Sequence, residues 1–230
     1  MSPEGRKVLV FFGATVVIGA LGVVAAPRLL GWAAGPENDV LMALVHTTQE
    51  GVSLTIPGAS VPLVSKEVHY DRITVQLDPA ARTAEALSTL DFTGALGDTE
   101  VSSLGVERTR FAYAGSWAPS AGWAPRLAAA VSALEARRVA LEQADAAALA
   151  RLTLGDAGID DQALRQVFAL QNRQYRVSAW FIRLDRDRGT VTEDYRLVGS
   201  LPDRPVDEEG RRSLQIERRN GEFFFSGGLM

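Results

Sequence analysis

Residues 8–26 form an uninterrupted apolar run that carries no charge, and Arg6 and Lys7 come directly before it. A helix rises about 1.5 Å per residue, so a run of this length spans nearly the roughly 30 Å hydrocarbon core of a bilayer. No second run of comparable length follows in the sequence. We therefore expect one transmembrane anchor at residues 8–26, with the rest of the chain held as a body at one face of the membrane.

The alternative to an anchor is a cleaved secretory signal peptide, which also has a basic start and an apolar centre. The run is longer than is usual for a signal peptide, and neither cleavage position is favourable. Cleavage after Ala26 would place Pro27 at the cut, and cleavage after Ala34 would place Trp32 three residues before the cut. Lipoprotein processing needs a cysteine, which the chain lacks. We therefore favour an uncleaved anchor.

The basic residues that flank the run predict its orientation. Arg6 and Lys7 precede it, whereas only Arg28 follows closely. Cytoplasmic flanks carry the excess of basic residues, so the amino terminus should be cytoplasmic and the body periplasmic or otherwise extracytoplasmic. Residues 1–34 would then be the cytoplasmic stub and anchor of a single-pass membrane protein.

Four small residues recur along one stripe of the expected membrane helix. They are Thr15, Gly19, Gly22 and Ala26. Small stripes let transmembrane helices approach closely, which predicts packing against a second helix. The alternative is that such residues are simply common in membrane helices.

The composition beyond the anchor is that of a folded body that does not bind nucleic acid. Hydrophobic residues make up 47% of the chain and charged residues 23%, and the net charge is −4. Nucleic-acid binding needs a basic face. Basic residues do cluster near the end of the chain, but acidic residues interleave with them, which predicts a solvated surface. The cluster contains Arg211, Arg212, Arg218 and Arg219, with Asp207, Glu208, Glu209 and Glu217.

Residues 35–119 are expected to form a small, mostly β unit. A short helix is predicted at 37–49, where apolar residues lie on one side and Gly51 follows as a stop. Alternation of apolar and polar residues then predicts strands, which we place at 52–56, 73–77, 87–92 and 106–113, with a short one at Trp117. The loop from Pro119 to Pro125 is rich in proline and glycine and predicts a domain boundary.

Residues 120–230 are expected to form an α+β domain that begins with helices. Helical spacing covers 127–141, Asp145 can cap the next helix, and a third helix is predicted at 161–171. Strand alternation then returns, and Asn220-Gly221 is a strong hairpin signal. The predicted strands are 175–182, 191–198, 213–219 and 223–225.

The two strand regions follow a similar plan at an offset near 106 residues. Leu77-Asp78 corresponds to Leu184-Asp185, and Ala114 to Trp117 corresponds to Asn220 to Phe223. A fixed offset predicts an internal repeat. Because identities are few, two unrelated antiparallel meanders remain the alternative.

The segment ALEARRVALEQADAAALARL at 133–152 and the meander that ends at Asn220-Gly221 resemble the nuclear transport factor 2-like, or SnoaL-like, superfamily. The resemblance covers about 121–230 and extends faintly to 37–119 as a reduced copy. It implies a cone in which helices pack into the concave face of a curved antiparallel sheet and enclose a pocket. The expected fold is thus α+β, with one transmembrane helix followed by two curved antiparallel-sheet units.

The resemblance implies either enzymes or proteins that only bind. Enzymes of this superfamily use an acidic base or an Asp-His pair with a hydrogen-bond donor in the pocket. This chain has only His46 and His69, neither beside a matching motif, so no catalytic residue is transferred. No nucleophilic cysteine, serine elbow or phosphate loop is present, and no cofactor is expected.

Neither acidic pair in the second unit predicts a metal site. Asp185 with Asp187, and Asp160 with Asp161, occur where turns and helix caps favour aspartate, and a calcium loop would need several more oxygen ligands. Tyr175, Asp194 and Tyr195 could point into the pocket of the second unit, although a tyrosine in a strand usually serves packing.

Aromatic residues of the second unit are the candidates for binding a ligand or a partner. Three consecutive phenylalanines place aromatic rings on both faces of one strand, which predicts that at least one meets a partner. The candidates are Tyr175, Trp180, Tyr195, Phe223, Phe224 and Phe225.

Together these patterns predict a membrane-anchored, non-enzymatic binding or scaffold protein of the cell envelope. Its partner would be a protein, a second copy of the chain or an apolar small ligand. The alternatives are an isomerase or lyase that acts in the pocket of the second unit, and a lipid-handling module.

Overall fold

The computed structural model describes residues 35–49, 53–155 and 161–228. The predicted anchor at 8–26 and its stripe of small residues lie outside the described residues. Within the described part of the chain, no helix is both long and apolar enough to cross a membrane.

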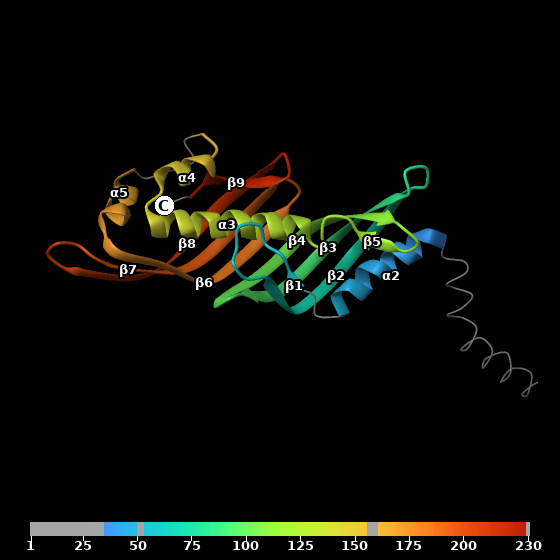
Figure 1. Cartoon of the computed structure of the whole chain (residues 1–230), viewed down its shortest axis with the longest axis horizontal. Coiled ribbons are helices and arrows are strands. Elements are labelled where there is room, and N and C mark those ends of the chain that lie inside the picture. Colours follow the sequence, from blue (N-terminus) through green and yellow to red (C-terminus); the bar gives the residue numbers. More distant parts are fainter. Residues whose placement is uncertain (1–34, 50–52, 156–160, 229–230) are drawn as a thin grey trace, which may run out of the picture.

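Nine strands of the described chain form one continuous sheet (Figure 1). Its spatial order is β1-β2-β3-β4-β6-β7-β8-β9, and the short β5 pairs with β4. The strands are β1 (Ser53–Leu54), β2 (Leu63–Asp78), β3 (Thr83–Leu96), β4 (Thr99–Tyr113), β5 (Trp117–Pro119), β6 (Gln171–Asp185), β7 (Arg188–Ser200), β8 (Pro205–Arg219) and β9 (Glu222–Gly227).

A parallel pair joins the two strand regions, which corrects the expectation of two antiparallel-sheet units. β4 pairs with β6 from Glu100 opposite Ala179 to Gly105 opposite Leu184, whereas all other named strand pairs are antiparallel. At Gly105 a Cβ atom would collide with the backbone carbonyl of Leu184, so glycine permits this close approach. Alternation in sequence identifies each strand but not its distant neighbour, which is why the junction was not predicted.

Four helices of the described chain pack around this sheet. They are α2 (Gly35–Gln49), α3 (Pro125–Gln143), α4 (Ala146–Arg151) and α5 (Asp161–Ala169). α3 lies across one face of the sheet, and it contacts β4 from the first region and β6 and β9 from the second (Figure 1). The Asp145 side chain accepts a hydrogen bond from the Ala148 N–H at 2.8 Å, which confirms the predicted cap of α4.

The buried side of α3 forms the main core together with the sheet. Leu127, Val131, Leu134 and Leu141 are fully buried at the spacing of one helical face. Strand residues from both regions pack against them, so a single core spans the parallel junction. A smaller cluster lies under α2, where Val40 and Leu44 pack with strand residues Ala84, Ala86 and Phe111.

The strands of the two regions follow the same order along the chain. β2 to β5 form one meander, and β6 to β9 form a second that ends in the predicted hairpin at Asn220-Gly221. Both hairpin residues have positive φ, 53° and 94°, as a tight two-residue turn requires. One sheet holds both regions. The internal repeat and the domain boundary between 35–119 and 120–230 stay predictions.

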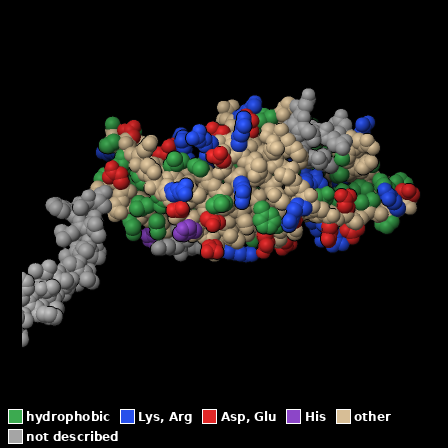
Figure 2. Space-filling view, turned by 180° about the vertical axis from the view of Figure 1, so that it is seen from behind, with side chains coloured by type: hydrophobic (Ala, Val, Ile, Leu, Met, Phe, Trp, Pro, Cys, Tyr) green, Lys and Arg blue, Asp and Glu red, His purple; other side chains and the backbone are tan. Residues whose placement is uncertain are grey.

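The face of the sheet opposite α3 is mixed in character. Figure 2 shows this side, where basic and acidic side chains are interspersed with hydrophobic ones. Arg196 pairs with Asp207 at 2.7 Å, and Arg211 donates to Asp194 at 2.8 Å. These ion pairs offset the positive charge of the arginines on this face of the sheet.

Candidate functional site

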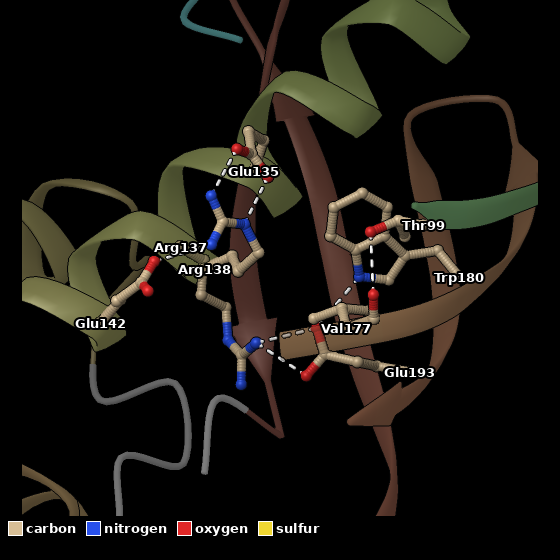
Figure 3. A network of polar contacts seen from close by, with 8 residues as sticks. All are labelled: Thr99, Glu135, Arg137, Arg138, Glu142, Val177, Trp180 and Glu193. Atoms are coloured by element: carbon tan, nitrogen blue, oxygen red, sulfur yellow. Dashed lines mark hydrogen bonds and ion pairs between the residues drawn. The ribbon is translucent and has the colours of Figure 1, made fainter. Parts of the chain in front are cut away.

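A buried glutamate beneath α3 is the centre of the largest polar network in the core (Figure 3). Glu193 of β7 is fully buried, because it lies on the same strand face as the core residues Val191 and Leu197. Arg137 of α3 donates from Nη1 to both carboxylate oxygens at 3.0 and 3.1 Å. Tyr175 Oη donates at 2.6 Å and Trp180 Nε1 at 3.0 Å, both from β6.

These donors keep Glu193 ionised. Burial alone would raise the pKa of Glu193, but the positive charge of Arg137 and the hydrogen bonds from Tyr175 and Trp180 bring it below its ordinary value. Burial also raises the pKa of Tyr175, so its hydroxyl stays a donor. A charged carboxylate whose two oxygens already accept several hydrogen bonds is a poor proton acceptor. The network therefore holds α3 on the sheet rather than offering a base.

A second group of polar side chains lies between this network and the surface. The Arg212 guanidinium stacks 3.9 Å from the centre of the Tyr195 ring, and its Nε lies 3.8 Å from Glu193 Oε1. The Tyr195 hydroxyl donates to Glu208 Oε1 at 3.1 Å, and its ring stacks on Tyr175. Tyr195, Glu208 and Arg212 thus separate the buried Glu193 from the surface.

These three residues help to line a cavity of about 600 Å³ beneath α5, which we name the α5 cavity. Four further polar residues line it, Gln162, Arg165, Gln166 and Arg204, so about half of the lining is polar. The apolar lining includes Val167, Leu170, Leu197, Leu201 and Val206. The volume falls within the usual range of small-ligand sites, and the wall is more polar than is usual for them.

A larger hollow of about 870 Å³ lies over the outer face of α3. Small residues of α3 form its floor, and the Ser132 hydroxyl there donates to the Pro57 carbonyl at 2.8 Å. Phe223 and Phe224 contribute to its border.

The structure places the aromatic candidates in three different settings. Tyr175 and Trp180 are buried donors to Glu193, and Tyr195 lies at the α5 cavity. Phe223 and Phe225 are buried in the core, whereas Phe224 is half-buried on the opposite strand face. The six residues therefore do not form one site.

The other titratable candidates lie away from the α5 cavity. His46 and His69 are exposed, and Asp194 pairs with Arg211 on the opposite face of the sheet. The side chains of Asp160 and Asp161 lie outside the described residues. Among the side chains that are described, no group of three or more metal-ligating residues is placed to hold an ion.

Sequence reasoning missed the residues that matter most to the network, Arg137 and Glu193. A signal for Glu193 was present, because it alternates in phase with Val191, Tyr195 and Leu197 and so belongs to the core face of its strand. A comparable signal marks Arg137, because it lies three residues after Leu134 and four before Leu141, on the buried face of α3.

A second buried glutamate, Glu107 of β4, meets the start of α3. Its Oε1 accepts the backbone N–H of Arg126 at 3.0 Å and its Oε2 that of Leu127 at 3.1 Å. Glu107 also accepts the N–H of Arg108 at 2.9 Å. It therefore caps a helix from a neighbouring strand, a role normally filled by the residue just before the helix. Burial raises the pKa of Glu107, and these hydrogen bonds only partly oppose the shift.

Comparison with known proteins gives structural neighbours only. No family model matches the sequence. No curated protein matches it either. A ketosteroid isomerase-like protein from Shewanella frigidimarina NCIMB 400 is 12% identical, with a TM-score of 0.39 over 43% of this chain and 91% of the other. An NTF2-like protein involved in plasmid conjugation is 7% identical, with a TM-score of 0.33 over 73% of this chain and 77% of the other. Of these two structural neighbours, the second is named as an NTF2-like protein.

Proposed function

We propose that this chain is a membrane-anchored, non-enzymatic binding or scaffold protein of the cell envelope. Its body would engage a partner protein or an apolar ligand. The observation that carries the proposal is the state of the two buried glutamates beneath α3. An isomerase of this kind needs a carboxylate that can act as a base and accept a proton from the substrate. Glu193 and Glu107 instead accept hydrogen bonds from the protein with both of their oxygens.

The α5 cavity supports a binding role. Its apolar residues suit the hydrocarbon or aromatic part of a ligand, and its polar residues, among them Tyr195, Glu208 and Arg212, would bind a polar part. Among the residues that line this cavity in the described chain, Glu208 is the only acid.

Native mass spectrometry of the full chain, released from detergent micelles, tests the binding proposal. We expect a bound partner, a second copy or a bound small molecule. For a small molecule, Val206→Trp should abolish the added mass because it fills the α5 cavity. Val198→Trp is the matched control. Val198 pairs with Asp207, the residue next to Val206, so its side chain faces the other side of the sheet. A bare monomer would count against the proposal, and a bound phospholipid would identify a lipid-handling module.

An isomerase or lyase is the second candidate, and one observation favours it. Glu208 lies at the α5 cavity and accepts a hydrogen bond from the Tyr195 hydroxyl at 3.1 Å, which pairs an acid with a donor. The chain would then convert its bound molecule. Glu208→Gln should stop such conversion and Glu209→Gln should not, because Glu209 is exposed and pairs with Arg196. Conversion that depends on Glu208 would overturn the non-enzymatic proposal.

The proposed orientation in the membrane can be tested with a single introduced cysteine, because the chain has none of its own. Asp203 is exposed in the turn between β7 and β8. An extracytoplasmic body predicts that Asp203→Cys reacts with a membrane-impermeant maleimide in intact cells. Labelling only after cell lysis would show that the body is cytoplasmic.

A further inference from the structure

A group of aromatic and apolar side chains lies beside the start of α2. Tyr113 and Trp117 form a ring pair with centroids 5.3 Å apart, and Trp117 is half-buried against the small cluster under α2. Tyr113 is 44% exposed, and Met42 on the neighbouring face of α2 is 56% exposed. Hollows of about 280 and 500 Å³ adjoin Trp117, and Pro36 lines the smaller one. We name Pro36, Met42, Tyr113 and Trp117 the α2–β5 surface.

The length of the tether limits how far this surface can lie from the membrane. This step rests on the proposed anchor at residues 8–26. Eight residues, 27–34, separate the end of that segment from the start of α2. A fully extended chain spans at most about 3.6 Å per residue, so the start of α2 lies within about 30 Å of the bilayer core. Since Pro36 lines the same hollow as Tyr113 and Trp117, this aromatic pair lies beside the start of α2 and is therefore within reach of the membrane.

The chemistry of the α2–β5 surface fits the headgroup region of a bilayer. Tryptophan and tyrosine are enriched there because their rings are apolar and their N–H or O–H groups remain hydrated. Asp39 lines both hollows and Arg82 lines one of them, so charge favours neither an anionic nor a cationic surface. A neutral phospholipid surface is therefore the occupant that the residues favour.

We propose that the α2–β5 surface lies in the headgroup region of the membrane that anchors the chain, with Tyr113 and Trp117 inserted. The body then stands end-on to the bilayer. α5 and its cavity lie at the opposite end of the elongated molecule (Figure 1), so they point away from the membrane and toward a partner or ligand.

Quenching by brominated lipid tests this placement on the full chain. The chain has four tryptophans, and Trp123 and Trp180 are buried in the core. In a Trp32→Phe background, vesicles of phosphatidylcholine brominated near the headgroup should quench fluorescence. Trp117→Phe should remove that quenching, and Trp123→Phe should leave it unchanged. Quenching that persists in Trp117→Phe, or that is absent from the background chain, would overturn the proposal.

A second measurement does not depend on tryptophan. A nitroxide at Ser116→Cys, beside Trp117, should collide with lipid-soluble oxygen more often than one at Asp203→Cys in the distant β7–β8 turn. Equal collision rates at the two positions would contradict the placement.

Flotation of the same vesicles separates this inference from the proposed anchor. If the chain floats with the vesicles but shows neither effect, the anchor is supported and the proposed placement of the α2–β5 surface is wrong. A chain that does not float refutes the anchor itself, and the placement with it.

Discussion

Glu107 and Glu193 are both buried beneath α3, one from each strand region, yet they hold the helix in different ways. Glu193 binds the side chain of Arg137, whereas Glu107 binds backbone N–H groups at the first turn. Arg126 lies beside Glu107 but makes no equivalent pair, because neither its Nε nor its Nη2 has a hydrogen-bond partner among the described residues. The same residue type at similar burial is thus an ion pair in one region and a helix cap in the other.

The comparison shows that burial alone does not set the charge state of a glutamate in this fold. Burial raises the pKa of both groups, but only Glu193 has a side-chain cation and two side-chain donors that reverse the shift. α3 is therefore tied to the second region through side-chain charge and to the first through its own backbone.

The largest effect should follow from Arg137→Leu. This change removes the 3.0 Å ion pair and leaves the buried charge of Glu193 with only the more distant Arg212 as a cation, and breaking a buried pair in this way costs about 3–5 kcal/mol. The free energy of unfolding from urea titration measures it. Arg138→Leu is the matched control on the same helix, and loss of its part-exposed ion pairs should cost less than about 1 kcal/mol.

A double substitution sharpens this result. Replacing Arg137 and Glu193 together by leucine removes both charges, so the double variant should be more stable than Arg137→Leu alone. Additive losses would show that the two residues do not interact as the 3.0 Å contact indicates.

Glu107→Ala should have an intermediate effect. It removes the acceptor for the Arg126 and Leu127 N–H groups, and loss of a helix cap costs about 0.5–2 kcal/mol. The measurement is again urea unfolding, with Glu100→Ala on the exposed face of β4 as the control. A cost equal to that of Glu100→Ala would refute the role of Glu107 as a cap.

The pH dependence of stability should separate the two glutamates further. The pKa of Glu193 lies below its ordinary value of 4.5, so its stabilising contribution is present above pH 4.5 and is lost as the pH falls through the lowered pKa. The pKa of Glu107 lies above 4.5, so its contribution is present below pH 4.5 and is lost as the pH rises through the raised pKa. As the pH falls, Glu193→Gln should therefore lower the free energy of unfolding by less, and Glu107→Gln should lower it by more. Parallel trends in urea unfolding would contradict the opposite shifts.

Arg126→Met should have the smallest effect. Arg126 is 4% exposed and burial lowers the pKa of its guanidinium. Replacing it by an apolar side chain of similar length therefore removes a desolvation cost together with its weak attraction to Glu107. We expect a change in unfolding free energy within about 1 kcal/mol of zero. A loss as large as that of Arg137→Leu would show that Arg126 and Glu107 form a second essential pair.

Local patterns in the sequence predict most elements of the fold. Alternation marks β3, β4, β6 and β7, helical spacing marks α3, and Asn220-Gly221 marks the last hairpin. No local pattern in the sequence indicates the parallel pairing of β4 with β6. The register between strands that are distant in the sequence depends on tertiary packing.

The candidate site is less predictable than the fold. Aromatic content pointed to Tyr175, Trp180 and Tyr195, which do gather near Glu193. Arg212 was predicted to lie on a solvated surface and no role was predicted for Arg137, because arginine is rarely buried unless a partner in three dimensions pairs with it.

The pairing of β4 with β6 also sets an expected order of folding. Within each meander, short turns bring neighbouring strands together, whereas the Thr99 hydroxyl donates to the Val177 carbonyl across 78 residues. Closing so long a loop costs more entropy, and distant contacts form more slowly. In pulse-labelled hydrogen exchange, amides of the β2–β3 and β6–β7 hairpins should gain protection before those between β4 and β6, and simultaneous protection would contradict this order. The two regions of the sheet would then behave in folding as separate units that α3 brings together last.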